Sequence, residues 1–235
     1  MRVMITGCAG FIGSHVLEKF IDTGHEICGV DCESYASNKK FINSIVAPNF
    51  RYKKQRIGYL TIKDVYDIDL VINIAAETHV DNSIKNTVPF VQTNIVETEN
   101  LFKLCCEHDI PVLHFSTDEV YGEALDGTYD ELQPLNPRNP YSATKASIDH
   151  LIASYQNTYG MRATIIRPSN NFGPRQNDEK FIPTIVRSLK EGKKIPVYGK
   201  GEQVREWTYV KHTAEATLAL AQKMSKGECL NEIYN

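Results

Sequence analysis

Length, composition and charge limit the kind of protein this chain can be. Its 235 residues suit one large α/β domain or two small ones, and the 42% hydrophobic and 23% charged fractions exclude a disordered or collagen-like chain. The 26 basic and 29 acidic side chains give a net charge of −3, which argues against non-specific nucleic-acid binding and a polybasic membrane anchor. The composition therefore favours small-molecule chemistry.

The cysteines and the amino terminus indicate a reducing compartment. Six cysteines form no CxxC pair and no cysteine–histidine cluster with zinc spacing, so we expect reduced thiols and no metal site. The chain runs from Met1 into Val3 without the apolar region of a signal peptide, and no apolar run approaches the ~18 residues of a membrane span. We expect a soluble, cytoplasmic protein without a membrane partner.

Short apolar runs alternate with stretches of helical periodicity, a rhythm typical of βαβ units around a parallel sheet. The predicted strands lie near 2–6, 26–30, 69–74, 111–116 and 163–167. The predicted helices are 13–23, 98–108 and 141–159, and the region 31–68 has no clear assignment. Further along we expect a helix near 179–191, a glycine-rich hairpin-like stretch around 195–210, a helix near 212–224 and a strand at 232–235.

A glycine-rich loop follows the first predicted strand and opens the first predicted helix. Glycines permit a tight turn and let the backbone approach a pyrophosphate at the amino end of a helix. Asp31 ends the second predicted strand, near the position of a carboxylate that binds an adenosine ribose. Glycine spacing alone also fits a structural turn, but strand, helix and acid together predict a dinucleotide site. Its loop residues are Gly7, Gly10, Phe11, Ile12 and Gly13.

These features predict a Rossmann-type, doubly wound parallel α/β sheet. We expect residues 1–167 to form the dinucleotide-binding domain with the catalytic residues, and 168–235 to form a small substrate-binding lobe. Asp31 would repel an adenosine 2′-phosphate, whereas Ser37, Lys39 and Lys40 could receive one. The sequence therefore favours NAD and leaves NADP open.

The sequence contains three Tyr-x-x-x-Lys matches, and one of them is placed for chemistry. Tyr141 and Lys145 stand at the start of a well-supported helix, where side chains four residues apart share a face. We expect the Lys145 ammonium to lower the pKa of Tyr141 and so make the phenol a general base. The pairs Tyr35/Lys39 and Tyr59/Lys63 fit ordinary surface residues better.

Polar residues follow the predicted strand that ends near residue 116. Ligands in open α/β sheets bind beyond the carboxyl ends of strands, so Thr117, Asp118 and Glu119 lie where a substrate would sit. Two neighbouring carboxylates also suit the first turn of a short helix. Beside a Tyr/Lys pair and a dinucleotide loop, an acid and a base are the better hypothesis.

With these motifs the chain resembles the extended short-chain dehydrogenases/reductases and, among them, the dTDP-glucose 4,6-dehydratases. The matching blocks include TGCAGFIGSH at 6–15, AAETHVDNSI at 75–84, STDEVYG at 116–122, NPYSATKAS at 139–147 and RPSNNFGP at 167–174. The STDEVYG block and the SNNFGP part of the last block are more discriminating than the glycine loop or the Tyr-x-x-x-Lys motif. Simple sugar epimerases of this superfamily share those two motifs but generally lack the Asp-Glu pair.

The resemblance implies roles for the central residues. Tyr141, assisted by Lys145, would take the proton of the sugar C4 hydroxyl while the C4 hydrogen passes to bound NAD, and Thr117 would bind the C4 oxygen. Glu119 would remove the C5 proton and Asp118 would protonate the departing C6 hydroxyl. The product would be a nucleotide-linked 4-keto-6-deoxyhexose.

The resemblance also implies further contacts and an assembly. Besides the glycine loop, Asp31, Tyr141 and Lys145, the cofactor would meet Ala75, Ala76, Thr93 and Asn171. The nucleotide-sugar substrate would meet Thr78, Asn170, Lys180, Phe181, Pro196, Tyr198 and Arg205. Helices 98–108 and 141–159 would pair in a homodimer, although their apolar stripes could simply pack on the sheet.

Several positions depart from the family. Gln55-Arg56-Ile57 stands where an Asp-Ile or Asp-Val pair usually meets the adenine, and Asn82 replaces an arginine. Family members continue beyond the equivalent of residues 232–235, so we expect a shortened substrate lobe, whether natural or a fragment. UDP-glucose and UDP-N-acetylglucosamine therefore stay open as substrates, as do inversion at C5 and a 4-epimerase or ketoreductase activity.

Overall fold

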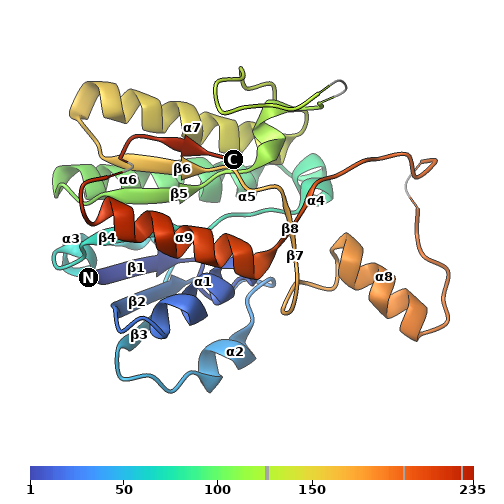
Figure 1. The fold of residues 1–235 in the computed structure, drawn as a ribbon, viewed down its shortest axis with the longest axis horizontal. Coiled ribbons are helices and arrows are strands. Elements are labelled where there is room, and N and C mark those ends of the chain that lie inside the picture. Colours follow the sequence, from blue (N-terminus) through green and yellow to red (C-terminus); the bar gives the residue numbers. More distant parts are fainter. Residues whose placement is uncertain (125–126, 198, 229) are drawn as a thin grey trace.

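The computed structural model describes residues 1–124, 127–197, 199–228 and 230–235 (Figure 1). Its centre is a seven-stranded, wholly parallel sheet in the order β3-β2-β1-β4-β5-β6-β9. The strands are Arg2–Thr6, Glu26–Asp31, Phe50–Lys54, Leu70–Asn73, Val112–Phe115, Ala163–Ile166 and Ile233–Tyr234, given as β1 to β6 and β9. The order reverses between β1 and β4, which confirms the predicted doubly wound sheet and places a crevice at the carboxyl ends of these strands.

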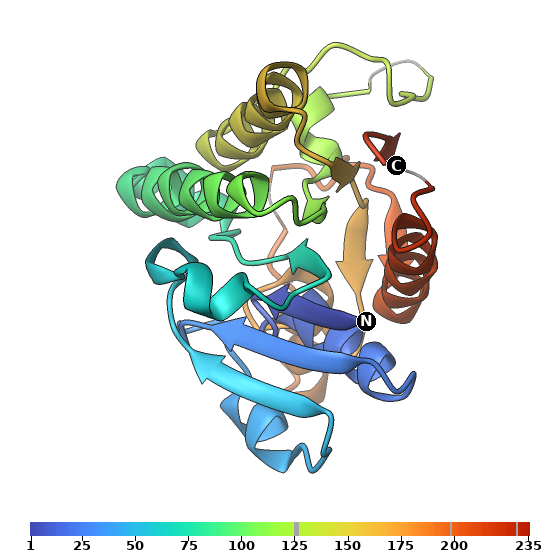
Figure 2. The ribbon, with the colours of Figure 1, turned by 90° about the vertical axis from the view of Figure 1, so that its left-hand side faces the viewer.

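Helices cover both faces of the sheet (Figure 2). Helices α1 (Phe11–Ile21) and α9 (Val210–Met224) enclose one core with residues of the strands, and Phe20 is fully buried there. Helices α6 (Thr98–Glu107) and α7 (Pro140–Tyr159) enclose the other core around Phe102. In the described part of the chain, none of the helices combines the length and the apolar character that crossing a membrane requires.

The ends of α7 follow from its local sequence. The Asn139 side chain accepts a hydrogen bond from the Ser142 amide, Ser142 Oγ accepts one from the Asn139 amide, and Pro140 occupies the first turn. At the other end Gly160 closes the helix with a left-handed φ of 71°. This capping fixes the helix start and so places Tyr141 and Lys145 in the first two turns.

The unassigned region 31–68 contains four short elements. They are α2 (Lys39–Ser44), β3, the 3₁₀ turn η1 (Ile57–Tyr59) and α3 (Ile62–Val65). Strand β3 is an edge strand whose five residues include Arg51, Lys53 and Lys54. Charged side chains on an edge strand disfavour pairing with a strand of another molecule. Because of these charges β3 is not an apolar run, and the sequence pattern did not predict it as a strand.

Four more short segments reach the carboxyl edge of the sheet. Helices α4 (Val80–Lys85) and α5 (Val88–Phe90) precede the π-helical segment η2 (Val91–Glu97), which continues into α6. The 3₁₀ turn η3 (Asp118–Tyr121) follows β5. Gly122 ends η3 with a φ of 87°, and a Cβ there would lie 2.5 Å from the Asn136 carbonyl oxygen, so this turn requires glycine.

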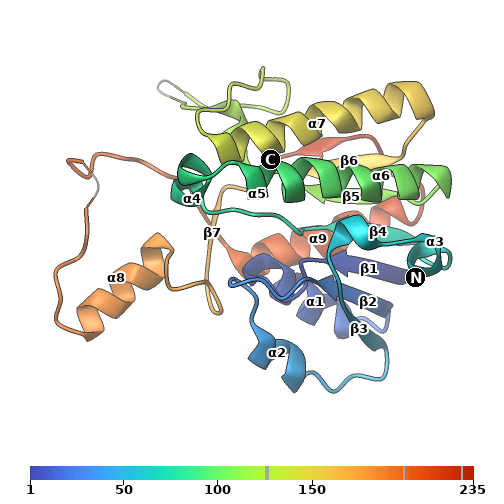
Figure 3. The same ribbon diagram turned by 180° about the vertical axis from the view of Figure 1, so that it is seen from behind.

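A smaller unit stands beside the main sheet. Strands β7 (Asn170–Phe172) and β8 (Trp207–Tyr209) pair in parallel, and α8 (Phe181–Lys190) projects away from the body in both opposite views (Figures 1 and 3). The predicted hairpin around 195–210 is therefore wrong, because β8 pairs with a distant strand. Helix α9 packs against α1 and β9 joins the main sheet beside β6, so these parts of the predicted second domain lie with the first.

The apolar stripes of α6 and α7 are used within the chain. Leu101, Cys105, Ile148 and Ile152 are buried in one core cluster with residues of the sheet. This burial matches the alternative in which the apolar stripes pack on the sheet of the same chain. The homodimer stays a prediction.

Candidate active site

The glycine loop between β1 and α1 forms a close backbone cradle. Gly7 has a left-handed φ of 66°, and a Cβ on it would lie 2.8 Å from the Ala75 backbone. A Cβ on Gly13 would lie 2.0 Å from the Gly7 carbonyl oxygen, and one on Gly10 3.2 Å from the same atom. Because the first amides of α1 lack acceptors within the helix, this loop offers N–H groups to an anion. Phe11 and Ile12 begin the helix.

Asp31 closes the cradle from the end of β2. Its buried carboxylate accepts hydrogen bonds from the Ala9 amide at 3.0 Å, the Glu33 amide at 2.7 Å and Ser37 Oγ at 2.7 Å. Lys39 lies 3.3 Å from the Glu33 carboxylate. Two of the three groups that were open as phosphate ligands, Ser37 and Lys39, are thus already paired with acids. A phosphate would meet a buried carboxylate here, which favours a free ribose hydroxyl.

Thr117, Asp118 and Glu119 meet at the end of β5 and the start of η3. Thr117 Oγ1 donates to Asp118 Oδ1 at 3.1 Å and accepts from the Glu119 amide at 3.3 Å. Burial, with a smaller contribution from Glu119, raises the pKa of Asp118 to about 6, against the Thr117 hydrogen bond. Glu119 Oε2 accepts from Asn139 Nδ2 at 2.9 Å. The two carboxyl groups therefore occupy different environments.

Tyr141 faces this cluster from α7, with only 8% of its surface exposed. Burial raises the pKa of Tyr141, Glu119 and Asp118 raise it further, and a hydrogen bond with Thr117 opposes them. The expectation that the Tyr141 pKa is lowered is therefore wrong for the protein alone. The loss of hydration disfavours the phenolate, and the nearby carboxylates disfavour it further. The Tyr141 amide is held by Ser83 Oγ at 3.2 Å.

Lys145 is buried one turn further along α7, 3% exposed. Its Nζ donates to the Phe115 carbonyl oxygen and lies 3.3 Å from His114 Nε2. Burial lowers the pKa of Lys145 to about 8, against the attraction of Asp149. The predicted catalytic residues thus come from the start of η3, just after β5, and from the first turns of α7. Among them Thr117, Tyr141 and Lys145 are buried.

Lys180, at the start of α8, reaches towards the same corner. Its Nζ donates to the Thr78 carbonyl oxygen at 3.4 Å, and burial lowers the pKa of Lys180 while Glu179, Glu119 and Asp81 raise it. The structure thus brings together two predicted substrate residues, Thr78 and Lys180.

Asn82, the replacement for an arginine, lies beside the exposed Tyr35 of the β2–α2 loop. Burial raises the pKa of Tyr35, Glu179 and Glu77 raise it further, and a hydrogen bond with Asn82 lowers it. The Tyr35/Lys39 pair, judged an ordinary surface pair, thus contributes its phenol to this end of the site.

Several predicted cofactor residues already have partners within the chain. Thr93 Oγ1 accepts from Arg56 at 3.0 Å, and Arg56 also donates to Glu97 at 2.8 Å. Asn171 Oδ1 accepts from Thr213 Oγ1 at 2.6 Å and its Nδ2 donates to the Ser169 carbonyl oxygen. Ala75 and Ala76 lie half-buried in the segment after β4. Asn170 begins β7 and is half-buried.

The other predicted substrate residues lie around α8 and the chain that follows it. Phe181 is 56% exposed and its ring stacks on Trp207. Pro196 and Arg205 are exposed between α8 and β8. Tyr198 lies outside the described residues.

Asn94 is a site residue that sequence reasoning missed. It lies in η2, exchanges hydrogen bonds with the Glu77 backbone at 2.8 and 3.0 Å, and donates to Thr144 Oγ1 at 2.9 Å. It therefore ties the segment after β4 to α7. Its neighbour Thr93 was predicted to meet the cofactor, but the π-helical segment that contains Asn94, a feature common at functional sites, leaves no clear signal in the sequence.

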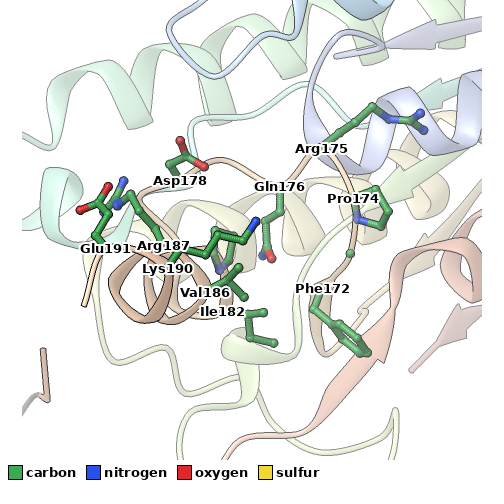
Figure 4. Close-up of a pocket in the computed structure, with 12 residues that line it drawn as sticks. Phe172, Pro174, Arg175, Gln176, Asp178, Ile182, Val186, Arg187, Lys190 and Glu191 are labelled. Atoms are coloured by element: carbon green, nitrogen blue, oxygen red, sulfur yellow. The ribbon is translucent and has the colours of Figure 1, made fainter. Parts of the chain in front are cut away.

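An open hollow of about 510 Å³ lies between the segment after β7 and α8 (Figure 4). Arg175, Arg187 and Lys190 line it together with the apolar Ile182 and Val186. None of the residues predicted to be catalytic contributes to its lining. It is therefore a neighbouring surface, separate from the chemical centre.

The parallel sheet, the glycine cradle and the Tyr141/Lys145 helix define an NAD dependent epimerase/dehydratase. Residues 3–235 match the model of the NAD dependent epimerase/dehydratase family, and the chain belongs to that family. It is 42% identical to the low-salt glycan biosynthesis protein Agl12 of Haloferax volcanii, over all of this chain and 76% of that protein.

Two solved structures show which relatives share the fold. A double mutant of the dTDP-glucose 4,6-dehydratase DesIV from Streptomyces venezuelae, crystallised with NAD, superposes with a TM-score of 0.93 at 34% identity, over the whole chain and 74% of that structure. A UDP-N-acetylglucosamine 4-epimerase from Methanobrevibacter ruminantium superposes with a TM-score of 0.89 at 29% identity, over the whole chain and 76% of that structure. The predicted family and cofactor class are confirmed, and relatives with two different activities share the fold.

Proposed function

We propose that the chain is a nucleotide-sugar 4,6-dehydratase, which forms a 4-keto-6-deoxyhexose and retains its NAD. The observation that supports this most strongly is the Thr117, Asp118 and Glu119 cluster against Tyr141. Eliminating water from a sugar requires a base at C5 and a separate acid at C6. Epimerisation at C4 alone has no use for such a carboxyl pair.

The cradle fits a dinucleotide. A Cβ at Gly7 would collide with the Ala75 backbone and one at Gly13 with the Gly7 carbonyl oxygen, so this tight loop at the start of α1 requires glycine. Asp31, at the end of β2, would accept a hydrogen bond from a ribose hydroxyl. We favour NAD over NADP because of the buried Asp31 carboxylate and the paired Ser37 and Lys39. NAD held by the glycine loop and Asp31 would supply the two-electron oxidation at C4 and the matching reduction at C6.

Tyr141 and Thr117 would act on the C4 hydroxyl. The Thr117 hydroxyl, already hydrogen-bonded near Tyr141, would hold the C4 oxygen while Tyr141 takes its proton. Because the Tyr141 pKa is raised in the protein alone, the phenol needs a proton acceptor or a cation close by at this moment. Lys145 on the same helix face is positioned for that task.

Asp118 and Glu119 would then eliminate water. A C4 ketone acidifies the C5 proton, which the Glu119 carboxylate removes. Asp118, with its pKa raised to about 6, keeps a protonated fraction near neutral pH and would protonate the departing C6 hydroxyl. The different surroundings of the two carboxyl groups support this division of roles.

The substrate is proposed to be a nucleoside-diphosphate hexose, with dTDP-glucose as the leading member and UDP-glucose and UDP-N-acetylglucosamine in the same set. Lys180 and Arg205 would supply cations for the diphosphate. A panel of these sugars, followed by NMR of the product, tests the assignment and fixes base, sugar and C5 configuration together. Absence of turnover across the panel refutes it.

The second candidate is a 4-epimerase or ketoreductase, because a UDP-N-acetylglucosamine 4-epimerase has nearly the same fold. An inverting dehydratase that also epimerises C5 is a variant of the first. The double variant Asp118→Asn, Glu119→Gln separates the two classes. An epimerase should retain activity after this change, whereas a dehydratase should lose the elimination of water.

We also propose that the enzyme works as a homodimer, on the strength of the family resemblance. The apolar stripes on α6 and α7 are buried within the chain, so a dimer would use other side chains of these helices. Light scattering in solution tests this assembly, and a monomeric mass would refute it.

A further inference from the structure

The turn after β3 places a guanidinium near the carboxylate that is expected to bind the ribose. Strand β3 pairs with β2 so that Lys54 lies opposite Asp31, and the Gln55 amide donates to the Asp31 carbonyl oxygen at 2.9 Å. Arg56 is the next residue. It therefore stands at the carboxyl edge of the sheet, one strand further from β1 than Asp31 does.

The order of the strands sets the order in which the parts of a dinucleotide would lie. The β1–α1 loop offers N–H groups to the pyrophosphate, and the Asp31 carboxylate at the end of β2 accepts from the Ala9 amide of this loop. In a dinucleotide the ribose stands between the pyrophosphate and the purine base. A ribose at Asp31 thus leaves the base on the side away from β1, which is the side of β3 and Arg56.

Two side chains of η2 hold the Arg56 guanidinium. Its Nε and Nη2 lie 2.8 and 2.7 Å from Glu97 Oε1, and Nη2 donates to Thr93 Oγ1 at 3.0 Å. The Glu97 side chain is only 7% exposed, whereas the Arg56 side chain is 43% exposed. The guanidinium is therefore fixed along one edge and open to a ligand on much of its surface.

The backbone that carries Arg56 is also held in place. Gln55 Nε2 donates to the Tyr59 carbonyl oxygen at 2.5 Å, and Ile57 is buried in the core. A Cβ on Gly58 would lie 2.6 Å from Glu97 Cγ, so glycine at this position leaves room for the Glu97 side chain. Because the backbone and the partner are both fixed, the flat guanidinium is kept in one orientation.

The charge of Arg56 acts on residues from two sides of the expected base position. Burial raises the pKa of Cys32, the residue after Asp31, and of Glu77, which follows β4, and Arg56 lowers both pKa values. Thr93, which Arg56 contacts directly, was predicted to meet the cofactor. The guanidinium thus lies among segments that follow β2 and β4 and beside η2.

The chemistry of a guanidinium limits what it can recognise in a purine. It is a planar cation that stacks on aromatic rings and donates hydrogen bonds, but it cannot accept one from the 6-amino group of adenine. The neighbouring acceptors, Thr93 Oγ1 and Glu97 Oε1, already receive N–H groups of Arg56. The arrangement therefore suits the face of a purine better than its 6-amino group.

We propose that Arg56 is a specificity-determining residue of the cofactor site, whose guanidinium stacks on the purine base of NAD and recognises the flat ring but not the 6-amino group. This inference rests on the cofactor site of the proposed function. Its consequence is a relaxed choice of purine. Nicotinamide hypoxanthine dinucleotide has the same flat ring, with an oxygen at position 6, and should bind nearly as well as NAD.

The first test compares these two dinucleotides in the wild-type chain. The protein is equilibrated with equal excess concentrations of both and separated from free nucleotide, and the bound nucleotides are released and quantified by chromatography. We expect a bound ratio near one. A preference for NAD of about fivefold or more, the cost of one lost hydrogen bond, would show that the 6-amino group is recognised and overturns the proposal.

The second test removes the planar group and keeps the charge. Arg56→Lys still offers a cation to the buried Glu97, so its urea unfolding should stay close to that of the wild type. Calorimetry on protein freed of nucleotide should find NAD and the hypoxanthine dinucleotide both weaker by about 5- to 30-fold, with their ratio still near one. The double variant Arg56→Met, Glu97→Gln leaves no unpaired carboxylate and should weaken both at least as much. Unchanged affinity for NAD in these variants overturns the proposal.

A matched control separates stacking from loss of charge at the same edge of the sheet. Lys54 is two residues away, and its Nζ lies 2.7 Å from the Glu33 carboxylate. Lys54→Met removes this exposed cation and should change the NAD affinity by less than about twofold. Equal losses in Lys54→Met and Arg56→Lys overturn the proposal.

Binding is measured without sugar, so this proposal and the proposed function fail separately. The expected affinities without turnover of any nucleotide sugar would refute the proposed function alone. Dehydration by a wild-type protein that rejects the hypoxanthine dinucleotide would refute the role of Arg56 alone.

Discussion

Replacing Asp118 by asparagine should stabilise the fold and weaken the elimination of water at the same time. The pKa of Asp118 is raised from 3.8 to about 6, so the unfolded chain loses this proton at a lower pH than the folded protein does. Wild-type stability therefore falls as pH rises through this window and stays reduced above pH 6. An asparagine does not ionise and escapes this loss.

The size of the effect follows from the two pKa values. About two units correspond to at most about 3 kcal/mol at pH 8, and the same linkage gives about 1.6 kcal/mol at pH 5. The advantage of Asp118→Asn in the free energy of unfolding should thus grow by about 1.4 kcal/mol between these pH values. Urea unfolding followed by circular dichroism measures it, with the exposed Asp22→Asn as control.

Activity must change in the opposite direction. Removing a general acid costs about 10²- to 10⁴-fold in rate, so elimination should fall by this factor while oxidation at C4 persists. A variant whose added stability does not depend on pH would show that Asp118 is not the perturbed acid. Unchanged dehydration would remove it from the chemistry.

Three further predictions concern the cofactor and the core. Gly13→Ala should abolish retention of bound NAD and Gly10→Ala should weaken it less, because their Cβ atoms would lie 2.0 and 3.2 Å from the Gly7 carbonyl oxygen. The absorbance of the purified proteins measures the bound NAD, and equal losses in the two variants would contradict this prediction. Arg167→Met should lower the free energy of unfolding by about 3–5 kcal/mol by stranding the buried Asp149 charge, and a loss under 1 kcal/mol in urea unfolding would refute this. Calorimetry should find NADP at least about tenfold weaker than NAD because of Asp31, and equal affinities would show that the carboxylate does not discriminate.

The sequence predicted those parts of the fold whose signal is local. The five main strands, the glycine loop and α7 were found because apolar runs, glycine spacing and the boundary residues Pro140 and Gly160 each constrain a few consecutive residues. Strand β3 was missed because its side chains are charged, and the β7–β8 pair because its partners are distant in sequence. Pairing between strands that are distant in sequence produces no recognisable pattern in consecutive residues.

In the candidate site, too, features set by consecutive residues were predicted and features set by tertiary packing were not. The spacing of Tyr141 and Lys145 and the acids after β5 could be read from the sequence because each motif lies within a few consecutive residues, and the catalytic roles of these residues stay a prediction. The rise in the Tyr141 pKa was missed because burial and the approach of Glu119 depend on tertiary packing.

Transfer of deuterium within the sugar tests the proposed reaction most directly. A nucleotide hexose labelled with deuterium at C4, such as dTDP-glucose, is incubated with the protein and the product is analysed by NMR. We predict a 4-keto-6-deoxy sugar with the deuterium on the C6 methyl group. A product that keeps the hydroxyl at C6 and has the deuterium on C4 would instead identify an epimerase and contradict the dehydratase assignment.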